Sequence, residues 1–341
     1  MDSIQDLNNW ISDGKDYFFQ RKPGATNVDA FALGNETNLG RNTVVICPFE
    51  SNTPRAFTIS LQWELSPESL TSLTINLAAL PQHENSISTT KSQYVNNVNT
   101  ALQAISNKQF EKVVIAQTLW IKLSDTSVIT SFLRACKSPD SYVYLLRLNG
   151  SIWIGASPEI FLKSDYNMCE TVALAGTRLS SKSNEDWGDK EVQEQLIVGE
   201  YIASSFAQLG LKNIKIGGQF TKTVGHIQHI CNRVSAQLSE DVHWTKLVTK
   251  LHPTPALAGF PKSSAIDFIL NLEDFKRKLY GGVLGVMGEH GIDLFVNIRC
   301  AELFSNGARL YAGAGINQNS IPESEWDETQ NKLEVMRSIL T

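Results

Sequence analysis

The sequence has few charged residues for its length, and the two signs nearly cancel. Its 341 residues include 30 Lys and Arg and 35 Asp and Glu, a formal net charge of −5, and charged residues make up 19% of the chain. An average globular domain has about 25%. Proteins that bind nucleic acids usually carry a basic patch and have a high pI. The composition therefore argues against a nucleic-acid partner.

Long hydrophobic runs are also missing. No stretch approaches the roughly 18 apolar residues of a membrane-spanning helix, and residues 1–10 lack the basic segment and apolar run of a secretory signal. Hydrophobic residues still make up 42% of the chain, which is enough to bury a sizeable core. We therefore expect a globular cytoplasmic protein that contacts no membrane.

Cysteine is sparse, and its pattern excludes two kinds of site. The cysteines are odd in number and widely spaced, and none forms a C-x-x-C pair. Neither a disulfide framework nor a zinc knuckle is therefore indicated. We expect small reduced core residues at Cys47, Cys136, Cys169, Cys231 and Cys300.

The hydrophobic pattern predicts hairpins alternating with helices. Asn149-Gly150 joins apolar runs at 142–148 and 151–156, which is a strong signal for a two-residue hairpin. A second hairpin is expected at 305–307. Other expected elements are strands at 43–47, 56–61, 113–123, 292–304 and 308–315, helices at 128–136, 189–209, 263–275 and 323–340, and a helical or mixed segment at 66–78. This combination indicates the α+β class.

One segment is predicted to be a linker. Residues 85–93 are polar and rich in Ser and Thr, so they are expected to join an N-terminal portion to the rest. Residues 1–90 carry no motif, and we expect them to complete the fold around a motif-bearing core at 91–341. The whole chain is thus predicted to form a single domain.

Two pairs of glutamates stand three residues apart on predicted helices. They are Glu191 with Glu194 and Glu325 with Glu328, and Lys332 lies one turn after the second pair. This spacing places both carboxylates of a pair on one helix face. Together the pairs could bind a hard cation such as Mg²⁺, which prefers oxygen ligands. Such pairs are more often solvated helix faces, so these residues alone leave both interpretations open.

Ten short motifs follow one another in a fixed order. They are FEKVVIAQ (110–117), GASPEIF (155–161), LAGTR (174–178), EVQEQLIVGEYI (191–202), IQHICNRV (227–234), LHPTPALAGFP (251–261), YGGVLG (280–285), VNIRCAEL (296–303), YAGAGI (311–316) and EWDETQNK (325–332). In this order they resemble the chorismate-utilising enzymes, which include isochorismate, salicylate, anthranilate and aminodeoxychorismate synthases. The resemblance implies an α+β fold of two stacked antiparallel β-sheets flanked by helices, with a Mg²⁺-dependent site between them.

The resemblance assigns the chemistry to Lys112 and Glu159. Isochorismate synthases add water at C2 of chorismate, and the lysine of the first motif, here Lys112, is the base that activates it. Anthranilate synthases, which use ammonia, usually have glutamine there. Glu159 matches the acid that protonates the departing C4 hydroxyl. Without the resemblance, Lys112 would be a solvated strand end and Glu159 a turn residue after Pro158.

The resemblance also implies that the four glutamates bind Mg²⁺. Glu194 and Glu328 are expected to bind the metal directly, and Glu191 and Glu325 are expected to act through its waters. The metal would then hold the ring carboxylate of chorismate.

Chorismate carries two carboxylates, and the resemblance implies donors for each. Gly176, Thr177 and Lys332 are expected to donate to the ring carboxylate. Arg299 and Tyr280 are expected to hold the enolpyruvyl carboxylate, which suits the planar fork of an arginine.

Three further residues are expected to shape the pocket. His229 aligns with an active-site histidine near the ring hydroxyls, although a lone histidine is more often a satisfied core residue. His226 is expected to be exposed. Gly313 and Gly315 would allow close backbone approach, or would mark a bulge in the strand.

Several positions help to distinguish which kind of chorismate-utilising enzyme the sequence resembles. Ala175 stands where aminodeoxychorismate synthases have a nucleophilic lysine, which argues against a covalent amine route. The run 252–257 resembles that of isochorismate synthases, and Ala256 and Leu257 would line the pocket beside the ring. Gln195 is a departure, because most members have histidine after the metal-binding glutamate.

These features predict an isochorismate synthase, an isomerase whose product feeds menaquinone or catechol siderophore synthesis. A salicylate synthase is the nearest alternative, followed by an anthranilate synthase and by a non-catalytic relative that binds a dicarboxylate. We expect chorismate and Mg²⁺ as ligands, a monomer, and no glutaminase subunit.

Overall fold

The computed structural model describes residues 3–38, 40–83, 87–123, 127–165, 167–179, 186–224, 227–238, 242–289 and 291–341. Within these ranges the strands are β1 (Tyr17–Arg21), β2 (Val28–Thr37), β3 (Thr43–Cys47), β4 (Arg55–Leu65), β5 (Lys112–Ile121), β6 (Tyr142–Leu148), β7 (Ser151–Ser157), β8 (Ile160–Ser164), β9 (Met168–Leu179), β10 (Lys212–Ile216), β11 (Phe220–Val224), β12 (Ile227–Gln237), β13 (Gly259–Phe260), β14 (Val283–Gly288), β15 (Gly291–Val296), β16 (Cys300–Phe304) and β17 (Gly307–Ile316).

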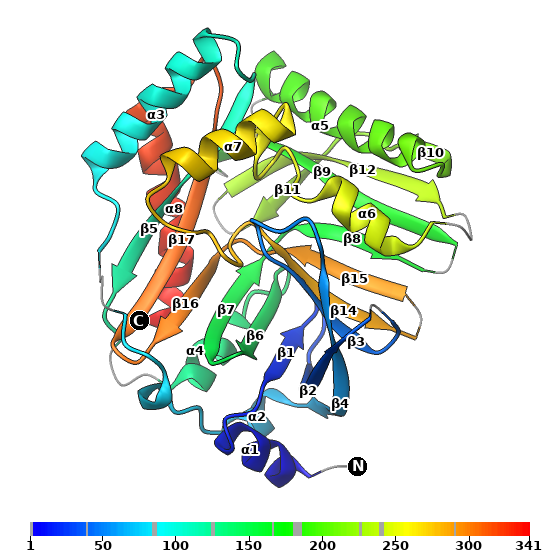
Figure 1. The fold of residues 1–341 in the computed structure, drawn as a ribbon, viewed down its shortest axis with the longest axis vertical. Coiled ribbons are helices and arrows are strands. Elements are labelled where there is room, and N and C mark those ends of the chain that lie inside the picture. Colours follow the sequence, from blue (N-terminus) through cyan, green and yellow to red (C-terminus); the bar gives the residue numbers. More distant parts are fainter. Residues whose placement is uncertain are drawn as a thin grey trace.

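The described strands form one antiparallel network that folds into two layers (Figure 1). Pairing runs in the order β12, β9, β8, β15, β14, β3, β4, β2, β1, β6, β7, β16, β17, β5 and β13, and both β10 and β11 pair with β12. Aromatic side chains fill the space between the layers, where the rings of Tyr142 and Phe295 stack 3.8 Å apart. The predicted α+β fold with antiparallel layers is confirmed.

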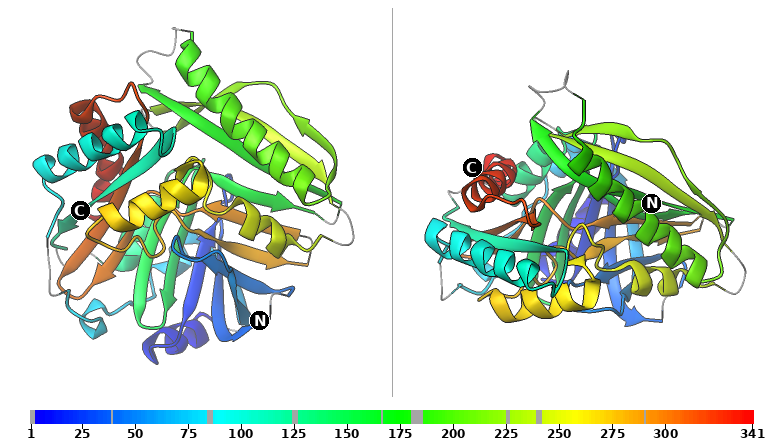
Figure 2. Two further views of the ribbon diagram at one scale, coloured as in Figure 1. Left: turned by 45° about the horizontal axis from the view of Figure 1, so that its top comes forward. Right: turned by 90° about the horizontal axis from the view of Figure 1, so that it is seen from above.

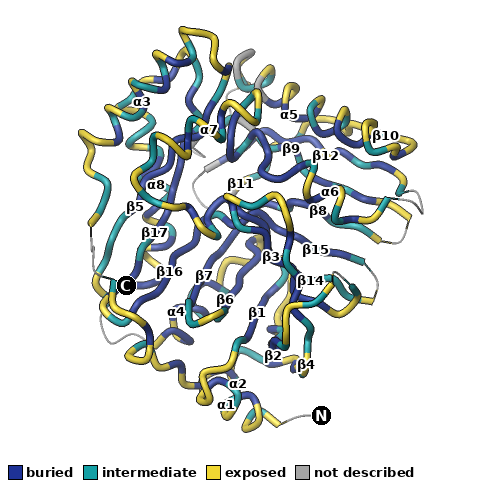
Figure 3. The backbone as a smooth tube through the Cα atoms, viewed as in Figure 1, coloured by how far each residue is buried: buried dark blue, intermediate teal, exposed yellow. Residues whose placement is uncertain are grey.

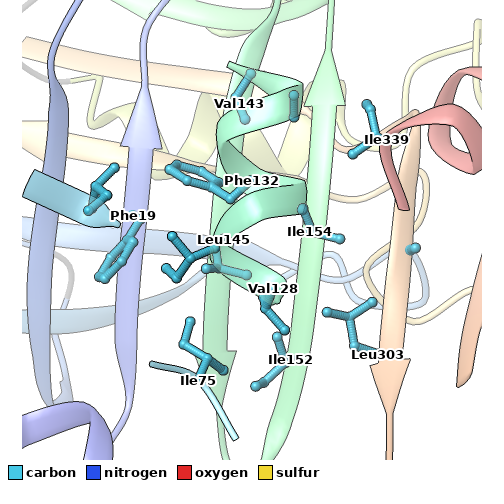
Figure 4. Packing of buried hydrophobic residues seen from close by; sticks show 14 of the residues in the cluster. Phe19, Ile75, Val128, Phe132, Val143, Leu145, Ile152, Ile154, Leu303 and Ile339 are labelled. Carbon is cyan, nitrogen blue, oxygen red and sulfur yellow. The ribbon is translucent and has the colours of Figure 1, made fainter. Parts of the chain in front are cut away.

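Helices cover the outer faces of these layers. They are α1 (Ile4–Ser12), α2 (Pro67–Leu70), α3 (Lys91–Ser106), α4 (Val128–Ala135), α5 (Asp189–Gln208), α6 (Trp244–Leu251), α7 (Lys262–Leu272) and α8 (Pro322–Leu340), with a 3₁₀ turn at Leu77–Ala79. Figure 2 shows α5 lying along β9 and β12. On the other layer α4 packs Val128 and Phe132 against β1, β6 and β7 (Figure 4). The apolar faces of helices and sheet thus bury each other.

The predicted linker is instead part of the packed structure. Thr90 caps α3, because its hydroxyl accepts a hydrogen bond from the Gln93 amide while the Gln93 side chain accepts one from the Thr90 amide. Lys91 to Gln93 are therefore helical. The Thr89 amide donates to the Thr118 carbonyl on β5 at 2.9 Å, so this segment is held along that strand. Asn85 and Ser86 lie outside the described residues.

The first predicted hairpin is confirmed and the second differs at one end. Asn149 and Gly150 have φ values of 50° and 79°, and positive φ at both residues is what a type I′ turn requires. The expected strand 292–304 is two strands, β15 and β16, because the chain turns at residues 297–299. The Asn297 side chain stabilises this turn, since it donates to the Leu279 carbonyl and accepts from the Tyr144 hydroxyl.

Burial follows this architecture. The strands at the centre are buried, and exposed residues lie on the helices, in the connections and on outer strands such as β10 (Figure 3). All five cysteines are free, and all except the half-buried Cys136 are buried, as predicted. Among the described residues, no helix is both long enough and apolar enough to span a membrane.

Candidate active site

A single cavity of about 170 Å³ collects the predicted site residues. Every one of them whose side chain the structure describes lines this cavity: Lys112, Glu159, Gly176, Glu191, His229, Ala256, Leu257, Tyr280, Arg299, Gly313, Gly315, Glu325, Glu328 and Lys332. The side chains of Thr177 and Glu194, and the whole of His226, lie outside the described residues. Residues spread over more than 200 positions of sequence thus meet at one place.

The two layers and two helices supply the walls. Lys112 begins β5, and Gly313 and Gly315 lie beside it on β17, opposite Ala116 and Val114. Strands β9 and β12 provide Gly176 and His229, and the helices α5 and α8 provide the glutamates. A neighbouring cavity of about 710 Å³ shares Lys112 and Asn317 with the first, so Lys112 lies at the boundary between the two.

Glu159 is held rigidly in an enclosed position. Its side chain is buried, with 5% of the residue exposed. Its backbone amide donates to the Ser157 hydroxyl at 3.3 Å, and its carbonyl accepts from the Val296 amide at 3.0 Å. Burial raises the pKa of Glu159 to about 7, against the opposing effect of nearby cations. A carboxyl in this state can donate a proton near neutral pH.

His229 is neutral in this environment. Burial lowers its pKa to about 4, an effect that its contact with the Gly176 carbonyl only partly offsets. Nδ1 lies 3.0 Å from that carbonyl oxygen, which can only accept, so Nδ1 carries the proton. In this tautomer Nε2 is a hydrogen-bond acceptor, which suits a ligand hydroxyl.

Helix α8 is tied to β17 through one lysine. Lys332 Nζ donates to the Gly313 carbonyl at 2.8 Å and forms an ion pair with Glu328 at 2.6 Å. Burial raises the pKa of Glu328, but Lys332 and more distant cations lower it by more, so its net pKa is below the ordinary value. Glu328 is therefore a carboxylate at neutral pH.

Arg299 has a left-handed backbone conformation, and Tyr280 lies close to the backbone of Gly313. Arg299 is the last residue of the turn between β15 and β16, with φ of 51°, and its carbonyl accepts from the Ala156 amide at 2.9 Å. The Tyr280 ring stacks on that of Tyr311, with centroids 5.5 Å apart. A Cβ on Gly313 would lie 2.9 Å from the Tyr280 hydroxyl. Gly313 thus permits a close approach, and its strand pairing is regular rather than bulged.

The cavity contains oxygen donors of the type that a hard cation prefers. Glu191, Glu325 and Glu328 present carboxylates to it. Mg²⁺ is commonly bound through one or two carboxylates while it keeps several waters. Among the side chains that the structure describes, no group of three or more His, Cys, Asp or Glu residues is placed to hold a metal ion. The side chain of Glu194, the fourth glutamate, is outside the described set.

Two charged residues near the site were missed by sequence reasoning. Arg277 is buried behind the wall, where it donates to the Leu257 carbonyl at 3.0 Å and the Val114 carbonyl at 2.7 Å and pairs with Glu273. Lys222 donates to the Pro158 carbonyl at 2.6 Å. Neither carries a motif signal of its own, because only the fold brings it to the site. Gln195, the departure noted above, is buried and accepts from the Gln219 side chain at 3.4 Å.

Solved structures share this fold. The isochorismate synthase DhbC from Bacillus anthracis, described as putative, superposes with a TM-score of 0.81 at 21% identity, over 97% of this chain and 98% of that one. Menaquinone-specific isochorismate synthase MenF from Escherichia coli gives a TM-score of 0.80 at 20% identity, over 96% and 89%.

Sequence relatives fall into two groups of enzymes. Isochorismate synthase MenF from Bacillus subtilis is 31% identical over 73% of this chain and 56% of its own length. Isochorismate synthase EntC from Escherichia coli is 29% identical over 96% and 87%. Anthranilate synthase component 1 from Acetivibrio thermocellus is 28% identical over 71% and 51%, so the matched region spans about half of two of these relatives.

The family comparison covers most of the sequence. The family described as chorismate binding enzyme matches residues 41–341, which include every residue of the cavity. This chain therefore belongs to the family of chorismate-binding enzymes.

Proposed function

We propose that this protein is an isochorismate synthase, a Mg²⁺-dependent isomerase that converts chorismate to isochorismate. The observation that carries the proposal is the shared cavity of Lys112 and Glu159, in which a lysine lines the same cavity as a carboxyl with a pKa of about 7. A water-adding isomerase needs one base and one acid in one pocket. The relatives named isochorismate synthase support the same activity.

In the proposed reaction Lys112 takes a proton from water as the water oxygen bonds to C2 of chorismate. The two ring double bonds each shift by one position, and the C4–O bond breaks. Glu159 gives its proton to the departing hydroxyl, which leaves as water. One water enters and one leaves, so the product is an isomer of the substrate. The larger neighbouring cavity, which Lys112 also lines, offers a source of water on the side of the base.

Cationic and polar groups would hold the substrate dianion. Arg299 and Tyr280 would bind the enolpyruvyl carboxylate, and Lys332, with the backbone at Gly176 and Thr177, would bind the ring carboxylate. His229 would accept from a ring hydroxyl through Nε2, and Ala256 and Leu257 would pack beside the ring. Bound Mg²⁺ would supply positive charge for the ring carboxylate.

The metal would be held by the glutamates of α5 and α8. Glu194 and Glu328 would bind it directly, and Glu191 and Glu325 would hold its waters. Removal of Mg²⁺ with EDTA is expected to abolish turnover, and added Mg²⁺ is expected to restore it. Activity that survives EDTA would contradict this part of the proposal.

Product analysis tests the activity itself. The purified chain is incubated with chorismate and Mg²⁺, with and without ammonium, and the products are separated by chromatography. Isochorismate alone is expected in both arms, from the single chain without a glutaminase subunit. Salicylate with equal pyruvate would identify a salicylate synthase, ammonium-dependent anthranilate would identify an anthranilate synthase, and binding without turnover would identify a non-catalytic relative.

A further inference from the structure

Lys222 is a half-buried lysine that no motif or assigned role explains. It lies on β11, and the register of β11 with β12 places it directly opposite His229. Residues directly opposite each other in an antiparallel pair project from the same face of the sheet. Because His229 lines the cavity, Lys222 projects toward the cavity side of β11.

The end of this side chain reaches the segment that carries Glu159. Lys222 Nζ donates to the Pro158 carbonyl at 2.6 Å. The peptide group that joins Pro158 to Glu159 is therefore held by a cation from β11, a strand that is distant in sequence. The Ser157 hydroxyl and the Val296 amide hold the Glu159 backbone from its other sides. Lys222 adds a third contact to this backbone segment but does not itself line the cavity.

The ammonium also acts on the carboxyl through space. Burial raises the pKa of Glu159, and among the cations that lower it Lys222 has the largest effect, ahead of Arg299, Lys332 and Lys112. The buried thiol of Cys231 on β12 also interacts with this carboxyl. Burial lowers the pKa of Lys222, and the Cys231 and Glu159 side chains partly restore it. Lys222 and Glu159 are thus electrostatically coupled.

We propose that Lys222 is a positioning residue for the acid Glu159, whose peptide it anchors and beside whose carboxyl it places a positive charge. Without it the segment 157–159 would lose one of the hydrogen bonds that hold it, and the carboxyl would remain protonated to a higher pH. This inference rests on the proposed function only where it calls Glu159 the acid, since the coupling of the two side chains does not depend on chorismate.

The test follows the protonated Glu159 carboxyl by difference infrared spectroscopy as a function of pH. The band is identified by its loss in Glu159→Gln. In the wild type its midpoint is expected near pH 7. In Lys222→Met the midpoint is expected to rise by about one pH unit or more, because loss of a nearby opposite charge has an effect of that size. Lys222→Arg, which keeps the charge, is expected to titrate like the wild type.

Two further variants sharpen the result. Lys215→Met removes an exposed lysine from β10, which also pairs with β12, and is expected to leave the midpoint unchanged. Lys222→Gln keeps a hydrogen-bond donor for the Pro158 carbonyl but removes the charge. If Lys222→Met does not fold, the midpoint of the Glu159 band is measured in Lys222→Gln instead. A midpoint unchanged by loss of the charge overturns the proposal. The titration needs no substrate, so a wild type that forms no isochorismate would refute the proposed function and leave this coupling standing.

A kinetic readout accompanies the titration. The limb of the pH profile of kcat that Glu159 governs is expected to move to higher pH in Lys222→Met, with the KM for chorismate little changed. Lys222→Arg is expected to restore the wild-type profile. A uniform loss of activity at every pH, not rescued by arginine, would indicate a merely structural role and would contradict the proposal.

Discussion

Lys332 and Glu328 form an ion pair of 2.6 Å, one turn apart on α8, at the edge of the cavity. The same ammonium donates to the Gly313 carbonyl on β17 at 2.8 Å. One side chain therefore fixes the helix to the strand and adds a positive charge to a site that is proposed to bind a dianion. Two of its three protons are used in these two contacts, and among the described residues no further contact uses the third, which a ligand could accept.

Lys332→Met should weaken substrate binding. Hydrogen bonds to charged groups contribute about 1.5–3 kcal/mol, so the KM for chorismate is expected to rise by roughly 10-fold to 100-fold. Steady-state kinetics measures this. Arg337→Met, on the exposed side of the same helix, is the control and should leave KM unchanged. An unchanged KM in Lys332→Met would rule out its proposed contact.

Lys112→Gln should abolish most of the turnover while chorismate still binds. Loss of a general base typically costs about 10²–10⁴ in rate, and kcat is expected to fall within this range. Single-turnover kinetics and equilibrium binding measure the two effects separately. Lys122→Gln changes an exposed lysine just beyond the other end of β5 and serves as the control. Turnover at the wild-type rate in Lys112→Gln would exclude Lys112 as the base.

Glu159 should make stability depend on pH. Its folded pKa of about 7 lies above the ordinary value of 4.5, so the folded state binds the proton more tightly than the unfolded state does. The resulting stability is complete below about pH 4.5 and is lost as the pH rises through 7. Between pH 5 and pH 8 the wild type should lose about 2–3 kcal/mol relative to Glu159→Gln. Urea unfolding of both proteins measures this, and parallel pH dependences would contradict it.

Arg277→Met should destabilise the fold. Arg277 and Glu273 form an ion pair with both side chains 2% exposed, and removal of one partner leaves a buried charge. Such a change typically costs about 3–5 kcal/mol. Arg337→Met breaks an exposed pair with Glu334 and should cost about 0–1 kcal/mol. Chemical denaturation measures the free energy of unfolding of both variants. Equally small decreases in the two variants would contradict the expectation that the buried ion pair contributes more to stability than the exposed one.

Gly313→Ala should disturb the site by overpacking. The new Cβ would lie 2.9 Å from the Tyr280 hydroxyl and 3.1 Å from the Ile115 carbonyl. Overpacking of this kind typically costs about 1–3 kcal/mol, and displacement of Tyr280 should raise the KM for chorismate. Gly218→Ala, with no atom within 4 Å of its Cβ, is the control for both measurements. A Gly313→Ala variant as stable and active as this control would contradict the close contact.

Local chemistry determined much of the fold before any tertiary contact was known. The positive φ values of Asn149 and Gly150 follow from the residues themselves, which tolerate this conformation. The helices of the two glutamate pairs follow from periodicity, and their spacing alone places Glu325 and Glu328 on one face. By contrast, residues 1–42 and the helix α3 were missed, because their strands and their helix are stabilised by neighbours distant in sequence.

The site was predictable as far as its motifs reach. The order of the motifs identified the residues of the cavity, because a family resemblance preserves positions that local pattern cannot interpret. It did not reveal Arg277 or Lys222, which lie 20 and 64 residues along the chain from the Leu257 and Pro158 carbonyls to which they donate. From sequence alone, Lys222 on the short polar strand β11 would be predicted to be solvated. Only the fold brings its ammonium to the Pro158 carbonyl, between β7 and β8.

The sequence by itself therefore determined the fold class, the hairpin turn and the identity of the groups in the cavity, because backbone preference, periodicity and motif order can all be recognised from the order of residues along the chain. Only the tertiary structure decided that β15 ends at a turn that projects Arg299 into the cavity, that Glu159 is enclosed and titrates near neutral pH, and that Lys332 links α8 to β17. The physical reason is that burial and Coulomb interactions depend on distance in space, which residue order along the chain does not specify.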